Sequence, residues 1–324
     1  MLRLVLTLCW TGVVTWLLAV GMTAWVLLRP ARLTPARAMA RLGRMSPADL
    51  GLAFEDVEFG VRDAKSGRDL RLIGWWLPGR PSSDRTVVIV HGYADSRIGA
   101  LAWAEPIVRQ VGCNVLVFDL RGHGESEGAF TTAGLRERFD VEQVVNQLRA
   151  MRPGETSQLF LLGTSMGAAI ALAAAAQTGE GLAGVIADSP VADFYHGAVA
   201  QLSLMGLAGA VVARPGVWLT ELVLGERFTS IRPAEVIRHR VRCPVLAMLP
   251  GDDVFLLSPA ADELARAVAD RAATDGGISQ VVYFPSVPHL MPLQQDPAKY
   301  VQALNRFCAA GKSDRLARAP AAHR

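Results

Sequence analysis

The sequence predicts a mostly parallel, doubly wound α/β domain that follows one membrane-spanning helix. Three observations support this fold class: apolar runs of strand length alternate with helical stretches, the first two runs form a hairpin, and no charged residue occurs from Leu4 to Leu28. The 324 residues, 51% of them hydrophobic, suffice for one large domain and an added segment. The net charge is only +3, and no basic block alternates with aromatic residues, so we expect no nucleic-acid partner.

The segment 4–28 is predicted to be a transmembrane helix. At about 1.5 Å per residue it is long enough to cross a hydrocarbon core of roughly 30 Å. A cleaved signal peptide is the alternative, but its apolar region is shorter and ends in a small-x-small site, whereas this run ends in Leu27-Leu28-Arg29-Pro30. We therefore expect an uncleaved, single-pass anchor in the lipid bilayer.

Residues 29–50 are predicted to form a basic linker, which either lies on anionic lipid head groups or forms an ordinary solvated helix. Its arginines outnumber Arg3 and the α-amino group, so the positive-inside rule places the rest of the chain in the cytoplasm. These linker arginines are Arg29, Arg32, Arg37, Arg41 and Arg44.

The predicted domain spans residues 51–310 and opens with short strands at 57–61 and 70–76, joined by the turn Lys65-Ser66-Gly67-Arg68. The runs 86–90 and 114–118 are apolar and rich in β-branched residues, as expected of strands buried on both faces. The next expected elements are helices at 100–110, 135–151 and after Ser165, and strands ending at Gly163 and spanning 183–187. After an irregular stretch, strands at 243–248 and 280–284 alternate with helices at 259–270 and 297–308, and 311–324 is predicted to be a disordered tail.

The pentapeptide Gly163-Thr164-Ser165-Met166-Gly167 lies between a predicted strand and a predicted helix. In that context, G-x-S-x-G makes a sharp turn that exposes the serine hydroxyl, and the glycines let the strand and helix approach each other. Ser165 is therefore the candidate nucleophile.

A serine is a weak nucleophile at neutral pH, so it needs a base and a group that orients the base. Asp252 and Asp253 follow one later predicted strand, and His289 follows the next. Because ligands bind at the carboxyl ends of parallel strands, these side chains are expected beside Ser165. Neighbouring aspartates cannot both point at one imidazole, and the pattern leaves both as candidate acids.

Five segments together resemble the α/β-hydrolase superfamily, and more narrowly its serine aminopeptidase-like and monoacylglycerol-lipase-like group, over roughly residues 55 to 308. The segments are His91-Gly92-Tyr93, Asp119 to Ser126, Gly163 to Gly167, Asp253 and His289. This resemblance implies an α/β-hydrolase fold with leading antiparallel strands. It also implies that Asp253, nine residues after Pro244, is the acid, with Asp252 as the alternative.

The resemblance further implies an oxyanion hole made by the backbone N–H groups of Tyr93 and Met166. We expect His91 to brace its loop without transferring protons, and the loop 119–126 to shape the pocket wall. Asp188 and Asp193 are weaker candidates for the acid. Residues 191–240 interrupt the strand–helix rhythm where this superfamily inserts a cap, and their apolar stretch 198–213 is either core or a lid that faces the membrane.

Together these features predict a membrane-anchored serine hydrolase that cleaves an acyl ester or thioester through Ser165, His289 and Asp253, with a lipid-derived acyl group as the leading small-molecule substrate. An aminopeptidase-like amide hydrolase and a non-catalytic binding or sensory protein are the alternatives. The four cysteines are widely spaced and form no C-x-x-C pair, so no metal and no cofactor are expected. The sequence leaves the oligomeric state open.

Overall fold

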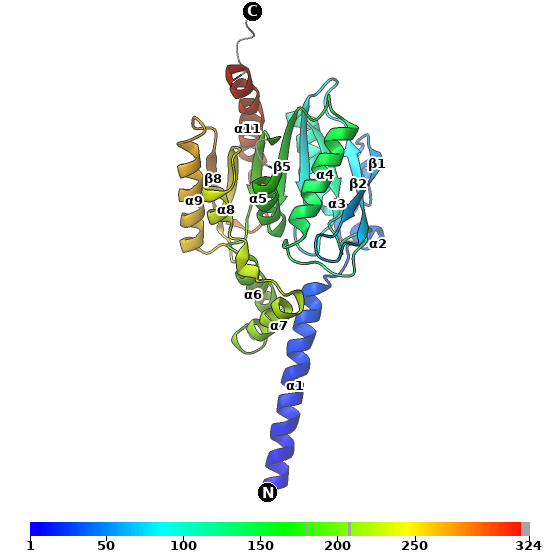
Figure 1. Cartoon of the computed structure of the whole chain (residues 1–324), viewed down its shortest axis with the longest axis vertical. Coiled ribbons are helices and arrows are strands. Elements are labelled where there is room, and N and C mark those ends of the chain that lie inside the picture. The colour runs from blue at the N-terminus through cyan, green and yellow to red at the C-terminus, as the bar shows by residue number, and fades with distance from the viewer. Residues whose placement is uncertain (179–180, 207–208, 319–324) are drawn as a thin grey trace, which may run out of the picture.

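The structure is a computed structural model that describes residues 1–178, 181–206 and 209–318. Within these residues, eight strands form one sheet in the spatial order β1-β2-β4-β3-β5-β6-β7-β8 (Figure 1). The strands are β1 (Glu55–Arg62), β2 (Asp69–Leu77), β3 (Arg85–Val90), β4 (Asn114–Phe118), β5 (Gln158–Thr164), β6 (Gly184–Asp188), β7 (Val245–Asp252) and β8 (Gln280–Pro288). β1 pairs antiparallel with β2 and β2 with β4, and all other pairs are parallel. The predicted α/β-hydrolase fold with a leading hairpin is confirmed.

The helices alternate with the strands as the sequence predicts. They are α1 (Leu2–Leu28), α2 (Pro35–Leu42), α3 (Arg97–Pro106), α4 (Glu137–Met151), α5 (Met166–Thr178), α6 (Phe194–Leu204), α7 (Arg214–Leu224), α8 (Pro233–His239), α9 (Ser258–Ala272), α10 (Pro292–Gln295) and α11 (Pro297–Arg318). Short 3-10 turns lie at η1 (Pro47–Leu50) and η5 (Phe228–Ser230), and π turns at η2 (Ile107–Val111) and η4 (Gly209–Ala213).

Two hydrophobic layers sandwich the sheet. Helices α4, α5 and α9 cover one face, and α3 and α11 cover the other. Strands β4, β5 and β6 are buried along their whole length, because both of their faces are covered by helices. This burial fixes the strand ends, and therefore fixes the loops that carry the candidate site.

The predicted cap region contains α6, η4, α7, η5 and α8. Helix α8 lies beside α9 (Figure 1) and contributes Val236 and Ile237 to the core of the domain, so it packs as part of the domain body. Helices α6 and α7 instead lie beyond the end of the sheet, next to the last turns of α1.

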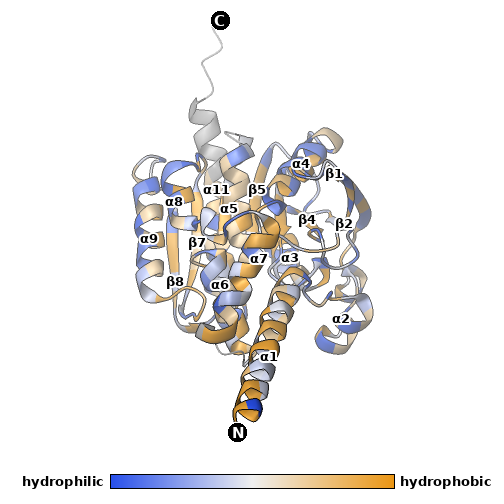
Figure 2. Cartoon of the chain, turned by 60° about the horizontal axis from the view of Figure 1, so that its bottom comes forward, coloured by the Kyte–Doolittle hydropathy of each residue, from blue (hydrophilic) through white to orange (hydrophobic). Residues whose placement is uncertain are grey.

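Among the described residues, α1 is the one helix that is long and apolar enough to cross a membrane, a property that a signal sequence near an N-terminus shares. Figure 1 shows it projecting from the end of the domain that carries α6 and α7, and the apolar colouring in Figure 2 covers most of its length.

The segment predicted as a basic linker is folded against the domain. The Arg32 guanidinium donates to three backbone carbonyls of the glycine-rich loop, those of Gly124, Ser126 and Gly128, at 3.1, 2.7 and 2.7 Å. Leu33 and Ala38 are buried in the core layer under α3. These contacts hold the domain close to the end of α1.

The chain end differs in part from the expectation. Helix α11 runs to Arg318, into the segment predicted to be a disordered tail, because the helix begun at Pro297 meets no proline or glycine pair that would end it. The rest of that tail, residues 319–324, lies outside the described residues.

Candidate active site

Ser165 occupies a sharp turn between β5 and α5. Its φ of 54° is in the left-handed region, which a residue with a side chain adopts at an energetic cost. A Cβ on Gly163 would lie 2.1 Å from the Gly167 carbonyl oxygen, and one on Gly167 would lie 2.1 Å from the Val90 carbonyl oxygen. Both glycines are therefore required for the strand and helix to pack this closely, which explains the G-x-S-x-G spacing.

His289 immediately follows β8 and reaches Ser165. Its Nε2 lies 2.8 Å from the Ser165 Oγ, and its Nδ1 lies 2.7 Å from Asp253 Oδ2. The His289 side chain is 13% exposed and that of Asp253 is fully buried. The structure thus brings together the three residues predicted to form a catalytic set in one hydrogen-bonded chain, whose Asp253 end is buried.

Asp253 and Asp252 lie in different surroundings. Asp253 is buried, and its second carboxylate oxygen accepts a hydrogen bond from the Phe255 N–H at 2.8 Å. Asp252 is exposed and ends β7. The geometry therefore favours Asp253 as the partner of His289, and the phenyl ring of Phe255 packs on the imidazole at a centroid separation of 4.4 Å.

Asp188 supports the turn that carries Ser165. Its backbone carbonyl accepts from the Ser165 N–H at 2.9 Å, and its carboxylate accepts from Trp103 Nε1 and the Tyr300 hydroxyl, both at 2.8 Å. Burial raises the pKa of this carboxyl, and its hydrogen bonds act in the opposite direction. The Ser189 hydroxyl bridges this carboxylate to the Leu290 N–H, so the network also fixes the residue after His289. Asp188 thus positions the site and does not contact His289 through a hydrogen bond.

Asp193, the other weak candidate for the acid, is hydrogen-bonded to the first turn of α6. It caps the N-terminus of α6 by accepting from the His196 N–H at 2.8 Å, and its other oxygen is 2.8 Å from His196 Nδ1. A side chain so occupied is oriented toward the cap helix and not toward His289.

The loop before α3 brings Tyr93 to the same place as Met166, and both residues line a pocket with Ser165. The loop approaches closely, because a Cβ on Gly92 would lie 3.3 Å from the Thr164 carbonyl oxygen and 3.5 Å from the Ser165 Cβ. This placement is compatible with the predicted use of the Tyr93 and Met166 N–H groups as an oxyanion hole.

His91 braces its loop, as expected. It is fully buried, its Nε2 accepts from the Leu120 N–H at 3.0 Å, and its Nδ1 lies 2.8 Å from the Gly92 carbonyl oxygen. His123 stacks edge-on against it with a centroid separation of 5.0 Å, and Ser126 donates to the Asp119 carbonyl. His123 and Ser126 are buried in the loop and do not line the pocket beside Ser165.

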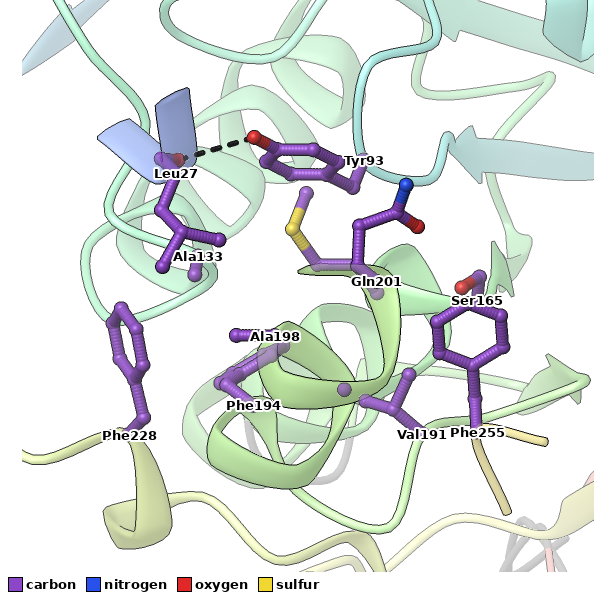
Figure 3. A pocket seen from close by; sticks show the side chains of 12 residues that line it. Leu27, Tyr93, Ala133, Ser165, Val191, Phe194, Ala198, Gln201, Phe228 and Phe255 are labelled. Atoms are coloured by element: carbon purple, nitrogen blue, oxygen red, sulfur yellow. Dashed lines mark hydrogen bonds between the residues drawn. The ribbon is translucent and has the colours of Figure 1, made fainter. Parts of the chain in front are cut away.

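The pocket beside Ser165 has a mainly apolar lining (Figure 3). Its walls include residues from α1, from the loop before α4, from the cap and from the loop after β7, namely Leu27, Ala133, Val191, Phe194, Gly197, Ala198, Gln201, Phe228 and Phe255. Sequence analysis did not assign Leu27, Gln201 or Phe255 to the site. The apolar character of 198–213 was the one available signal for a cap that lines it. Among the described residues, no cluster of three or more His, Cys, Asp or Glu is placed to hold a metal ion.

A serine at a strand–helix turn, with a histidine and an aspartate from later strand ends on an eight-stranded sheet of this order, is the arrangement typical of the α/β-hydrolase fold. The chain has the α/β-hydrolase fold, and residues 81–239 match the family model described as serine aminopeptidase, S33. That match includes Ser165 and ends before Asp253 and His289.

Two bacterial proteins are among the relatives found by sequence. The chain is 29% identical over 190 residues to the uncharacterized protein YfhR of Escherichia coli O157:H7, covering 56% of this chain and 60% of that protein. It is 30% identical over 173 residues to the uncharacterized protein YqkD of Bacillus subtilis strain 168, covering 53% and 56%. The matched region thus spans 60% or less of the length of either relative.

Solved structures show the same fold. The Pyrococcus furiosus esterase Pf2001 superposes with a TM-score of 0.67 at 22% identity, covering 88% of this chain and 98% of that one. A thermophilic esterase from Thermogutta terrifontis superposes with a TM-score of 0.55 at 22% identity, covering 79% and 99%. At these identities the likeness establishes the fold.

Proposed function

We propose that this protein is a membrane-anchored serine hydrolase that cleaves an acyl ester or thioester through an acyl-enzyme intermediate. The observation that carries the proposal is the hydrogen-bonded chain from Ser165 through His289 to Asp253, at the wall of an apolar pocket.

The proposed reaction follows from the geometry. His289 Nε2 takes the proton of the Ser165 hydroxyl as the oxygen attacks the carbonyl carbon, and the buried Asp253 carboxylate stabilises the imidazolium that forms. The N–H groups of Tyr93 and Met166 hold the negative oxygen. His289 then gives the proton to the leaving alcohol or thiol. Water, activated by the same imidazole, releases the acid and restores the serine.

The pocket lining favours an acyl ester over an aminopeptidase substrate. An aminopeptidase must bind the ammonium group of its substrate, which requires a carboxylate or several carbonyl acceptors. Among the described residues that line the pocket, none is acidic, and the polar side chains are those of Tyr93, Ser165 and Gln201. An acyl chain needs only the apolar wall that is present.

The membrane location is proposed on the length and apolar character of α1 and on the arginines that follow it. Arg32 is occupied by loop carbonyls, and Arg44 lies 3.4 Å from the carbonyl oxygens of Ile98 and Gly99. Arg29, Arg37 and Arg41 remain exposed and still outnumber Arg3 and the α-amino group at the other end of α1. The proposed location of the domain is therefore the cytoplasmic side.

The function is tested with purified full-length protein in detergent, assayed on p-nitrophenyl esters of graded chain length and on aminoacyl p-nitroanilides, with Ser165→Ala as control. We expect ester hydrolysis that the control lacks, and slower or no cleavage of the anilides. Faster cleavage of the anilides would establish the aminopeptidase alternative. A folded wild type that cleaves neither class would support the non-catalytic binding alternative.

A further inference from the structure

The last turns of α1 are part of the folded domain. From Leu2 to Leu18 the helix is exposed, but Val20, Thr23, Ala24 and Leu27 are buried at 7% exposure or less. Their spacing of three and four residues places them on one helical face. This face packs against the cap, chiefly against α7.

The contact between α1 and α7 is close. A Cβ on Gly216 would lie 2.3 Å from Thr23 Cγ2, so this position accepts no larger residue without movement of one helix. The Trp16 indole N–H also donates to the Val211 carbonyl at 2.7 Å, and Val211 lies in the turn η4, which directly precedes α7. Small residues at a contact between apolar helices allow this kind of approach.

The C-terminal carbonyls of α1 bond to active-site loops. The Tyr93 hydroxyl donates to the Val26 carbonyl at 2.7 Å and lies 3.4 Å from that of Leu27, and the Thr131 N–H donates to the Leu28 carbonyl at 2.9 Å. Carbonyls in the last turn of a helix have no partner within the helix. Here the loop that carries Tyr93 supplies one, and this ties α1 to a loop that contacts Ser165.

Leu27 lies at the far end of the pocket from the serine. Figure 3 shows Ser165 and Phe255 at one end, and Leu27 and Phe228 at the other, with Phe194 and Ala198 from α6 between them. Because Leu27 is 6% exposed and fixed by its neighbours, its side chain limits the depth of the pocket.

We propose that the last turn of α1 is a substrate-selecting wall of the active site, and that Leu27 sets the length of the acyl chain that the pocket accepts. The inference rests on the proposed function and refines it. The substrate is a linear fatty acyl ester or thioester whose carbonyl lies at Ser165 and whose methyl end lies against Leu27. The membrane helix then acts in substrate selection as well as in anchoring.

The test compares the chain-length profile of kcat/KM for p-nitrophenyl esters, from acetyl to palmitoyl, in the full-length wild type, Leu27→Ala and Leu27→Trp. Leu18→Ala is the matched control, because Leu18 is on the same helix and is 69% exposed. We expect Leu27→Ala to move the optimum to longer chains and Leu27→Trp to move it to shorter ones. The ratio of kcat/KM for chains on either side of the wild-type optimum should change by about 10-fold. The Leu18→Ala profile should match the wild type.

The outcomes separate the two proposals. If the wild type cleaves esters and Leu27→Ala retains its profile, Leu27 does not limit the pocket and this inference is wrong, while the proposed function stands. If the wild type cleaves no ester of any length, the proposed function fails first and the inference fails with it. Leu27→Ala decides the question if Leu27→Trp does not fold.

Discussion

Asp253 and Asp252 are adjacent residues that we expect to differ sharply in their effect on catalysis. Asp253 Oδ2 is hydrogen-bonded to His289 Nδ1, whereas Asp252 is exposed. Replacing Asp253 by Asn keeps the size of the side chain but removes the charge that stabilises the imidazolium. We expect Asp253→Asn to lower kcat by about four orders of magnitude and Asp252→Asn to lower it less than about 3-fold. Steady-state kinetics on one ester check this, and the reverse pattern would move the acid to Asp252.

His91 gives the fold a pH dependence of its own. The pKa of His91 is lowered from its ordinary value of 6.5 to about 3, mainly by burial and to a smaller extent by the neighbouring His123. Between these pH values the unfolded chain binds a proton that folded His91 does not, so the free energy of unfolding falls as the pH falls.

The variant His91→Gln removes this titration and retains an acceptor for the Leu120 N–H. Between pH 3 and pH 6.5, we expect its free energy of unfolding to depend less steeply on pH than that of the wild type, by up to about 1.4 kcal/mol per pH unit. Urea unfolding at a series of pH values measures this slope. Equal slopes in the two proteins would mean that His91 is protonated in the folded state.

The residues of the candidate site could be predicted where a motif fixes the local geometry. They could be predicted less well where the direction of a side chain depends on strand alternation. Ser165 and His289 follow from the elbow and from chain order. The choice of Asp253 needed the resemblance, because the pairing of β7 with β8 shifts register between Pro250 and Asp252 and breaks the two-residue period. The role of Asp188 was not predictable, since its partners Trp103 and Tyr300 come from α3 and α11.

At the scale of elements, the contact between α1 and α7 depends on Gly216. Adding a methyl group there forces it against the Thr23 side chain. Gly216→Ala should therefore destabilise the folded protein by about 1 to 3 kcal/mol, despite the higher helix propensity of alanine.

The matched control is Gly21→Ala, because a Cβ at Gly21 on α1 would meet no atom within 4 Å. We expect this variant to unfold at the same temperature as the wild type or above it. Thermal unfolding of both variants in one detergent provides the comparison. Equal midpoints for Gly216→Ala and the wild type would show that the helices separate easily.

The elements themselves follow from the sequence because strands and helices in this fold carry distinct apolar periods. The packing of α1 does not. Helix α1 is apolar on every face, so no periodicity marks the side that contacts α7, and Val26 lies 67 residues from its hydrogen-bond partner Tyr93. The packing of α8 was not predictable for a similar reason. Its apolar residues pack on the domain core, and the same residues could equally have packed within a cap.

At the scale of the whole molecule, the domain lies directly at the end of the apolar helix α1. The exposed part of α1, from Leu2 to Leu18, is about 26 Å long, close to the roughly 30 Å of a hydrocarbon core. On α7, Trp218, Leu222 and Val223 are 62 to 64% exposed, beside α1. In the proposed membrane-anchored form, this arrangement would place the cap at the membrane surface, where the proposed acyl substrate would enter.

The proposed cytoplasmic orientation predicts the behaviour of a fusion at the C-terminus. Alkaline phosphatase needs disulfides that do not form in the cytoplasm, so a fusion after Arg324 expressed in bacteria should be inactive, whereas a fluorescent reporter there should fluoresce. The stacking of Arg29 on Trp25, with the guanidinium carbon 4.0 Å from the ring centroid, provides an interfacial anchor for this orientation. An active phosphatase fusion would place the domain outside the cytoplasm.

The central claim is that Ser165 is an activated nucleophile, and covalent labelling tests it most directly. The full-length protein in detergent is treated with a fluorophosphonate probe, and the modified residue is located by peptide mass spectrometry. We predict one adduct, on Ser165, which is absent in Ser165→Ala and strongly reduced in His289→Ala, because Oγ loses its base. A folded wild type that remains unlabelled while a related esterase reacts under the same conditions would contradict the account.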